Sequence, residues 1–381
     1  KLFQIYNRCA ICLFPFFSYS DVAGRFVIIL KSHDSICCCS VDEVQDEMAT
    51  RFNKSKQVAD YLVSEGKRYI ADKINTKEYE KYKNVLPFVV FNTTGRERTS
   101  VVSVEIDVTR KSGWLKKCAY DLDEINVPNY KLIDSDGNSI PFKIEDLGVK
   151  FGYDLPKDKF RQPYMARRVR VTFEAENISA VGYKTYALVE GDTEKVTDTL
   201  VSSENCMEND AIRVEINKNG SLNVTDKASG RTYKGVAYYE ETGDLGNEYM
   251  YKMPEGSKAI TTQDTVAKIE LAEDEPYRAM YKITNTITVP KSGDDNFEDE
   301  KSHMVFFKER VGGRSNDTVE MKIETFVSLD KNGKGVKIKT RFDNEVKDHR
   351  VRIMVPTGIN SDVHKADSVF EVVTRNNRHN A

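Results

Sequence analysis

The sequence has no large excess of either charge, no long hydrophobic run and a single tryptophan. Its 381 residues carry 57 Lys and Arg against 60 Asp and Glu, which gives a formal net charge of −3. Proteins that bind duplex nucleic acid usually show a strong basic excess or a basic face, so this balance argues against a nucleic-acid partner. Only 10 residues are proline, whereas 39% are hydrophobic and 10% are aromatic, which favours a folded chain over a disordered one. The length suggests two or three domains.

The start of the chain lacks a segment long enough to cross a membrane. Residues 10–18 are the most apolar stretch there, but Pro15 interrupts them and a span needs about 20 residues. Their length is compatible with a signal-peptide core of about 7 to 15 residues. The seven cysteines are an odd number, and residues 37–39 are three cysteines in a row, a poor arrangement for a disulfide framework. We therefore expect no membrane partner and a reducing compartment, the cytoplasm.

Several enzyme motifs are also missing. The sequence has no Gly-x-x-x-x-Gly-Lys-Ser/Thr phosphate loop and no Gly-x-Ser-x-Gly nucleophile elbow, which argues against those two enzyme classes. The five histidines do not pair at a metal-ligand spacing, and the Cys-x-x-Cys formed by Cys9 and Cys12 has no second pair. A complete zinc site therefore cannot be drawn from the sequence.

One long helix is expected after residue 40. Residues that share one helical face recur there at steps of three and four, namely Val41, Val44, Met48, Phe52, Ser55, Ala59, Leu62 and Gly66. Ser40 and Glu43 have the spacing of a capping box, in which each side chain satisfies a free amide of the first turn. A second, shorter helix is predicted around residues 76–83, and Pro87 marks a change of pattern.

From about Leu86 onward the hydrophobic period becomes two residues, as in 102–108 and 168–173, which is typical of strands with one buried face. Turn sequences separate these strands at residues 134–138, 219–220, 229–230 and 332–333. Many short strands with few helices between them predict antiparallel β-sandwiches, so the expected fold class is multidomain and mainly β. The acidic stretch 293–300 is expected to be a solvated loop.

Three features are candidates for binding. His33 and Asp34 stand just before the long helix and could meet a metal and a polyhydroxyl substrate, although an exposed loop is the simpler interpretation of their spacing alone. Trp114 could stack on a sugar or rest on a sheet as a loop residue. The alternation of Arg168 and Arg170 favours one solvated strand face over an anion site.

The residues around His33 resemble a known family. Residues 33–37, followed by 39–44, closely resemble the last active-site motif of bacterial family 38 glycoside hydrolases, the α-mannosidases and mannosylglycerate hydrolases. Further similar segments follow in the same order at residues 88–98, 182–186, 209–216, 220–222, 226–231, 243–249, 349–352, 366–368 and 372–375. The matches extend from about residue 31 to 375, nearly the whole chain, which is more specific than any single motif.

The resemblance implies a protein with a catalytic α/β barrel, a helical bundle and large β-sandwich domains. For this chain it implies the end of the barrel in residues 1–40 and a helical-bundle segment in 41–84. A first β-sandwich domain would occupy 85–200, and a large β-sandwich domain, incomplete at its C-terminus, would occupy 201–381. The fold expected here is therefore mainly β, after the end of an α/β barrel and part of a bundle.

The implied activity is retaining, metal-dependent hydrolysis of α-mannosides. In this family a divalent metal, usually zinc, is held by a His-x-Asp pair, by the nucleophilic Asp and by the histidine that His33 matches; it would bind adjacent sugar hydroxyls. Asp34 matches a residue that touches the sugar. Because a β-domain tyrosine reaches the active site in this family, Tyr249 and Tyr251 could face the sugar; packing in the core or on an edge strand is the alternative for both.

Two departures from the family pattern matter. Cys38 stands where the family usually has Gly, and a side chain could crowd a turn there. The chain also has no His-x-Asp and lacks the nucleophile motif. We therefore expect the C-terminal portion of such an enzyme, with one metal ligand of about four, no nucleophile or general acid, and no activity by itself.

The alternative from another class is a noncatalytic carbohydrate-binding or structural β-sandwich protein. The expected partner is a mannosyl saccharide or a mannosylglycerate-type substrate, and a homo-oligomer is compatible with the family. Leaving-group recognition depends on pocket shape and largely on the absent barrel. The sequence therefore does not separate an α-mannosidase from a mannosylglycerate hydrolase.

Overall fold

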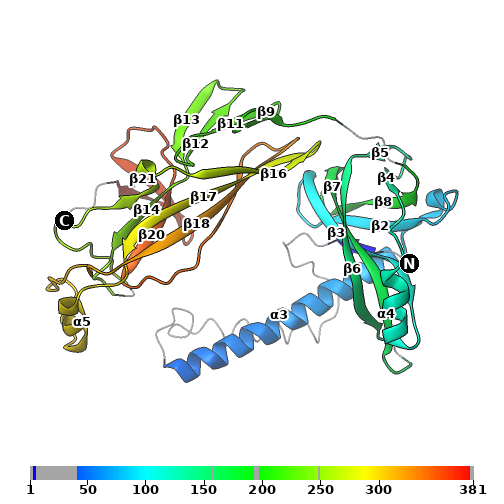
Figure 1. The fold of residues 1–381 in the computed structure, drawn as a ribbon, viewed down its shortest axis with the longest axis horizontal. Helices are drawn as coiled ribbons and strands as arrows, with labels where there is room; N and C mark the ends of the chain where they lie inside the picture. The colour runs from blue at the N-terminus through cyan, green and yellow to red at the C-terminus, as the bar shows by residue number, and fades with distance from the viewer. Residues whose placement is uncertain (1–2, 6–40, 157, 193–196, 248, 378–381) are drawn as a thin grey trace. The chain divides into compact units, whose positions relative to one another are not determined.

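The computed structural model describes residues 3–5, 41–156, 158–192, 197–247 and 249–377. The chain divides into two compact units, Lys1–Thr197 and Asp198–Ala381. Both units are built mainly from antiparallel strands, which confirms the predicted fold class (Figure 1). Within the described ranges, no helix is both long enough and apolar enough to cross a membrane.

The predicted long helix is confirmed as α3 (Asp42–Ala71). The predicted capping box is wrong, because the N-cap is Val41: its carbonyl accepts the first helical hydrogen bonds, and its side chain has no polar atom to cap the helix. Ser40 lies outside the described residues. The second predicted helix is reduced to the single 3₁₀ turn η1 (Lys77–Tyr79), and the residues after it form turns up to Asn84, which has a φ of 51°.

The first unit contains a β-sandwich of two sheets. One five-stranded sheet consists, in spatial order, of β1 (Phe3–Ile5), β2 (Leu86–Asn92), β8 (Gly182–Glu190), β4 (Tyr130–Asp134) and β5 (Ser139–Ile140). The other sheet consists of β3 (Arg98–Lys111), β7 (Gln162–Ile178) and β6 (Phe142–Asp154). Strand β1 runs parallel to β2, and the other pairs are antiparallel.

Three aromatic rings join the two sheets of the first unit. Phe88 from β2, Tyr186 from β8 and Phe173 from β7 are all buried, with ring centroids 4.9 to 5.9 Å apart. Valines and isoleucines from both sheets surround them in one hydrophobic core. The alternating pattern in 102–108 and 168–173 is therefore correct, because it supplies this shared inner face.

A short helix that the sequence pattern did not predict follows β3. Helix α4 (Leu115–Asp123) buries Cys118 and Leu122 and packs against β7. Trp114 is its N-cap residue, with 75% of its surface exposed. Sequence inspection missed α4 because only two buried positions mark its inner face.

Arg168 and Arg170 lie on one face of the sheet formed by β3, β7 and β6. Arg168 Nε donates to Asp107 Oδ1 at 2.6 Å, and Arg170 Nη2 donates to Glu105 Oε1 at 2.9 Å. Arg167 Nη1, on the opposite face, donates to the Asp123 carboxylate. These arginines have carboxylate partners, which leaves the strand-face interpretation as the better one.

The described residues of the second unit form four sheets. The first consists, in spatial order, of β13 (Arg231–Val236), β12 (Leu222–Asp226), β11 (Ile212–Ile216), β10 (Cys206–Glu208) and β9 (Val201–Ser203). The second consists of β15 (Ile260–Thr261), β14 (Tyr238–Gly243) and β20 (His349–Met354). The third consists of β16 (Lys268–Glu275), β17 (Arg278–Pro290), β18 (Thr318–Asp330) and β19 (Lys337–Arg341), and the hairpin of β21 (Val363–Ser368) and β22 (Glu371–Asn376) is the fourth.

The long strands β17 and β18 connect the two cores of this unit (Figure 1). At one end, Tyr281 and Val327 pack with the sheet of β9 to β13. At the other end, Ile287 and Ile323 pack with Tyr239 from β14. A short 3₁₀ turn, η2 (Thr262–Asp264), lies between β15 and β16.

The predicted solvated loop at residues 293–300 is wrong. Most of it is helix α5 (Asp295–Ser302), whose N-cap Asp294 accepts a hydrogen bond from the Phe297 amide at 2.8 Å. Phe297 and Glu300 are buried. The acidic composition concealed this helix, because its single buried aromatic residue gives no helical period.

Removing one of the three core rings should destabilise the first unit. We expect Phe173→Ala to lower its free energy of unfolding by about 3–5 kcal/mol, because it leaves a cavity between the two sheets. Urea denaturation followed by circular dichroism measures this difference. Phe160→Ala, at an 86% exposed position, is the control and should change stability by less than about 0.5 kcal/mol. Equal effects of the two substitutions would contradict the assignment of the core.

Candidate functional site

The predicted metal ligand and its neighbour belong to the segment before the long helix α3. His33 and Asp34 lie outside the described residues. In the parts of the chain that the structure describes, no three His, Cys, Asp or Glu side chains are grouped so as to hold a metal ion. The donor set within the described residues therefore does not fit a metal centre.

The two predicted tyrosines belong to the loop that follows β14, residues 244–252, here called the tyrosine loop. All of it except residue 248 is described. The Asp244 carboxylate accepts hydrogen bonds from the amides of Gly246 at 2.8 Å and Lys252 at 3.1 Å. The Leu245 amide donates to the Lys252 carbonyl at 2.7 Å, and the Leu245 side chain is 1% exposed. These bonds and the buried leucine close the base of the loop.

A second set of bonds shapes the tip of the tyrosine loop. Asn247 Oδ1 accepts hydrogen bonds from the amides of Tyr249 at 3.0 Å and Met250 at 2.9 Å. The Asn247 amide donates to the Met250 carbonyl at 3.0 Å. The tip presents Tyr249 to solvent, with 65% of its surface exposed. An exposed ring on a hydrogen-bonded turn is suited to contact a ligand.

Tyr251 has a different environment from Tyr249. Its hydroxyl donates to Thr242 Oγ1 at 3.0 Å, and the guanidinium carbon of Arg350 lies 3.4 Å from its ring centroid. Tyr251 is half-buried at the base of the loop. The structure therefore separates the two tyrosines: Tyr249 lies at the exposed tip, and Tyr251 packs where the loop leaves the sheet.

A buried ionic cluster lies beside this base. Glu241 on β14 is fully buried, and Arg314 donates to both of its oxygens, with Nη1 to Oε2 at 2.8 Å. His349 Nδ1 lies 3.3 Å from Glu241 Oε1, and its Nε2 lies 2.9 Å from Asn344 Oδ1. Burial raises the pKa of Glu241, but the hydrogen bonds from His349 and Arg314 outweigh burial and hold that pKa below its usual value.

Sequence reasoning did not find this cluster. The adjacent acids Glu240 and Glu241 look like an exposed pair, and Arg314 is distant from them in the sequence. The resemblance included His349 and Arg350 without assigning them a role. The available signal was the two-residue period of the strand, which points Glu241 to the same side as the buried Tyr239.

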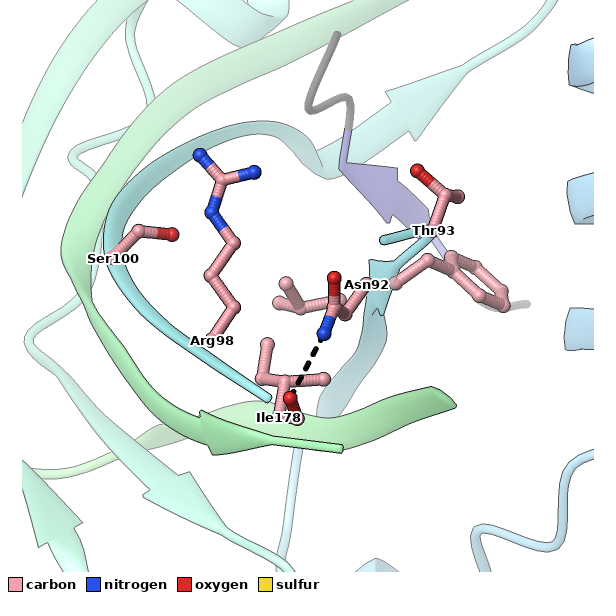
Figure 2. A pocket seen from close by; sticks show the side chains of 7 residues that line it. Asn92, Thr93, Arg98, Ser100 and Ile178 are labelled. Carbon is pink, nitrogen blue, oxygen red and sulfur yellow. Dashed lines mark hydrogen bonds between the residues drawn. The ribbon is translucent and has the colours of Figure 1, made fainter. Parts of the chain in front are cut away.

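Two hollows among the described residues are alternative candidate sites. The one at the end of β2 is lined by Arg98, Ser100 and neighbouring residues and has a volume of about 10 Å³, room for about one water molecule (Figure 2). Asn92 crosses it, and its side-chain nitrogen donates to the Ile178 carbonyl at 3.0 Å. This hollow is too small for a sugar, and the Asn92 hydrogen bond across it serves to hold the end of β2 against β7.

The other hollow, of about 380 Å³, lies between the β11–β12 turn and η2. Its amide side chains bond to the protein itself: Asn217 Nδ2 donates to Ser221 Oγ at 3.0 Å, and Asn219 Nδ2 donates to the Gln263 carbonyl at 3.0 Å. These bonds stabilise the turn, so the tyrosine loop is the better candidate.

Neutralising the buried carboxylate should be costly at neutral pH. Glu241→Gln leaves Arg314 and His349 without their anion, and we expect a loss of about 3–5 kcal/mol in the free energy of unfolding. Because the pKa of Glu241 is lowered on folding, its contribution is present above its unfolded pKa and disappears as the pH falls through its folded pKa. The difference between variant and wild type should therefore shrink below about pH 4.

Thermal and urea unfolding at several pH values measure this dependence. Glu240→Gln is the matched control, since it removes an ion pair with Arg352, whose side chain is more exposed than that of Arg314. It should cost about 1 kcal/mol or less. A pH-independent loss in Glu241→Gln would show that packing, and not charge, is responsible.

Two family models match the two units. "Glycosyl hydrolases family 38 C-terminal domain 1" matches residues 83–190, and "Glycosyl hydrolases family 38 C-terminal domain" matches residues 207–381. A protein of Halalkalibacterium halodurans that carries the name "Putative mannosylglycerate hydrolase" is 36% identical over 373 residues, covering 94% of this chain and 41% of its own length.

Solved structures agree with these matches. An α-mannosidase from Enterococcus faecalis V583 is 36% identical with a TM-score of 0.90, covering 96% of this chain and 42% of its own. Another solved structure, of a protein in the glycosyl hydrolase family 38 from Enterococcus faecalis, is 35% identical with a TM-score of 0.89, covering 96% of this chain and 44% of its own. This chain spans less than half the length of these relatives. The chain belongs to glycoside hydrolase family 38.

Proposed function

We propose that this chain is the C-terminal portion of an α-mannosidase-type glycoside hydrolase. The observation that carries the proposal is the match to the Enterococcus faecalis α-mannosidase, at 36% identity and a TM-score of 0.90 over 96% of this chain. The Halalkalibacterium halodurans relative also carries the name of a hydrolase of a mannosyl compound. The proposed substrate is therefore a mannosyl saccharide or a mannosylglycerate-type compound.

The proposed chemistry is retaining hydrolysis with two carboxylic acids supplied by the part of the enzyme that this chain lacks. We propose His33 as one ligand of a divalent metal, most simply zinc, and Asp34 as a sugar contact, because both match the family motif. A bound metal would serve as a template and Lewis acid for the sugar hydroxyls. The role of this chain is then to bind and orient the sugar.

Tyr249 is the proposed sugar contact within the described residues. Its ring is exposed at the tip of a loop with several internal hydrogen bonds, so little ordering is needed when a ligand binds. An aromatic ring offers both an apolar face and, in tyrosine, a hydroxyl for hydrogen bonding. Tyr251 supports this contact from the base of the loop through Thr242 and Arg350.

We propose that the protein is cytoplasmic. Cys118 and Cys206 are buried free thiols, which is in keeping with a reducing compartment. The run of three cysteines at residues 37–39 supports the same placement, since neighbouring cysteines are poor partners for a disulfide framework.

The full-length protein should hydrolyse p-nitrophenyl α-mannoside and lose this activity on chelation. We expect His33→Ala to bind less zinc and to lower kcat/KM by more than about 100-fold, since even outer partners of a metal site cost 10- to 100-fold. Zinc content by mass spectrometry and steady-state kinetics are the measurements, and NMR should show the α-anomer first. His364→Ala, an exposed histidine on β21, is the control.

Three outcomes would contradict these proposals. No hydrolysis of any mannosyl compound would remove the proposed activity, and sugar binding that survives chelation would then favour a noncatalytic carbohydrate-binding protein. A β-anomer as the first product would exclude retention. Unchanged zinc content in His33→Ala would remove that residue from the metal site.

Truncating the exposed ring should weaken sugar binding. We expect Tyr249→Ala to raise KM about tenfold in the full-length enzyme, with Tyr249→Phe intermediate because it keeps the ring and loses only the hydroxyl. Tyr120→Ala removes a tyrosine of similar exposure from α4 and should leave KM unchanged. An unchanged KM in Tyr249→Ala would show that the loop tip does not touch the sugar.

A further inference from the structure

The connection between β17 and β18 is a folded support. Residues 293–314, here called the α5 segment, are closed by a β-bridge between Gly293 and Arg314. The Asp294 carboxylate accepts from the amides of Phe297 and Gly313, both at 2.8 Å. Phe297 is 2% exposed, and a Cβ placed on Gly293 would lie 2.3 Å from its ring. The segment is therefore tightly packed around one phenylalanine.

The buried carboxylate of Glu300 joins helix α5 to the end of the α5 segment. Glu300 Oε1 accepts from the Val311 amide at 2.7 Å, and its Oε2 accepts from the Gly312 amide at 3.2 Å. A Cβ placed on Gly312 would lie 2.7 Å from Phe297 Cβ. The backbone just after Arg310 is thus held against α5. This contact fixes the position of the backbone from which the Arg310 side chain extends.

Arg310 extends from this support to the tyrosine loop. Its Nη1 donates to the carbonyls of Leu245, at 2.8 Å, and Gly246. Its Nε donates to the Val305 carbonyl at 3.0 Å, and its guanidinium carbon lies 5.6 Å from the Phe297 ring centroid. One side chain therefore joins two consecutive carbonyls of the loop to the α5 segment.

A lysine of the tyrosine loop binds the α5 segment in the opposite direction. Lys252 Nζ donates to the carbonyls of Lys308 at 2.8 Å and Arg310 at 2.6 Å. The two segments therefore exchange cationic donors and backbone acceptors in both directions. Charge-assisted hydrogen bonds of this kind are stronger than neutral ones, so the contact resists opening of the loop.

The backbone of the tyrosine loop has no room for a side chain at Gly246. A Cβ placed on Gly246 would lie 1.7 Å from the Met250 carbonyl oxygen, so any other residue would force the tip apart. Gly246 is one of the two residues whose carbonyls Arg310 holds. The glycine allows the tight turn, and the arginine fixes its direction.

We infer that Arg310 is a positioning residue of the sugar site: it holds the Leu245 and Gly246 carbonyls and so keeps the tyrosine loop in the shape that presents Tyr249. This inference rests on the proposed function, in which Tyr249 contacts the sugar. Arginine suits the task because its planar guanidinium offers several donors in a fixed geometry, which a lysine ammonium does not. The energy of ordering the loop is then spent on folding and not on binding.

The test compares Arg310→Ala, Arg310→Lys and Gly246→Ala in the full-length enzyme. We expect Arg310→Ala to raise KM for p-nitrophenyl α-mannoside about tenfold and to change kcat less than about twofold. Arg310→Lys should recover part of the loss, because an ammonium can still reach one carbonyl. Gly246→Ala should raise KM in the same way while Arg310 is intact. Arg231→Ala is the matched control: it removes another arginine-to-carbonyl bond, to Thr357, and should leave KM unchanged.

A second measurement does not depend on activity. Hydrogen exchange of the loop amides, read by mass spectrometry in the present chain, should accelerate at least about tenfold in Arg310→Ala, whereas amides of β17 and β18 keep their rates. Faster exchange with an unchanged KM would overturn the positioning role and leave a structural one. Unchanged exchange would show that the Arg310 hydrogen bonds do not hold the loop. If the parent enzyme hydrolyses no mannoside, the proposed function fails, and exchange still decides whether Arg310 holds the loop.

Discussion

The pairing of β17 with β18 is the constraint on which the second unit depends. Thirteen residue pairs run in continuous register from Arg278 with Asp330 to Pro290 with Thr318. Every second side chain of the two strands faces the same side of the sheet. These side chains pack into one core at one end of the pair and into a second core at the other end. Where the cores meet, Asn285 and Thr325 are buried but hydrogen-bonded, to Asn219 and to Tyr239, so the polar layer does not interrupt the sheet.

This long pair also decides where the candidate site forms. The connection between its two strands carries the α5 segment, and at the same end β14 finishes opposite the start of β20, with Gly243 paired to His349. Arg314 bonds from the α5 segment to Glu241 on β14. Three chain segments far apart in sequence are therefore joined by charge at one end of the sheet, and the tyrosine loop leaves from that junction.

The sequence predicted the elements with strong periods and missed those that depend on single contacts. The long helix and the alternating strands were confirmed because many residues repeat the same signal. Helix α5 was missed because Phe297 is its one buried hydrophobic residue, which gives no helical period. The capping box was wrong because the helix begins at Asp42, a one-residue difference that local spacing does not resolve. In the candidate site, the resemblance proposed Tyr249 and Tyr251 as sugar contacts, whereas Glu241, Arg314 and Arg310 were not singled out from the sequence.

The sequence by itself determined the mainly β architecture, the long helix and membership of glycoside hydrolase family 38, because period and ordered motifs are local properties of the chain. Tertiary structure alone decided that Tyr249 is exposed while Tyr251 packs under Arg350. It also decided that Arg310 meets the carbonyls of Leu245 and Gly246. The Arg310 contacts join residues about 65 positions apart, and they form only once the α5 segment is folded by its own hydrogen bonds, which no local pattern in the sequence specifies.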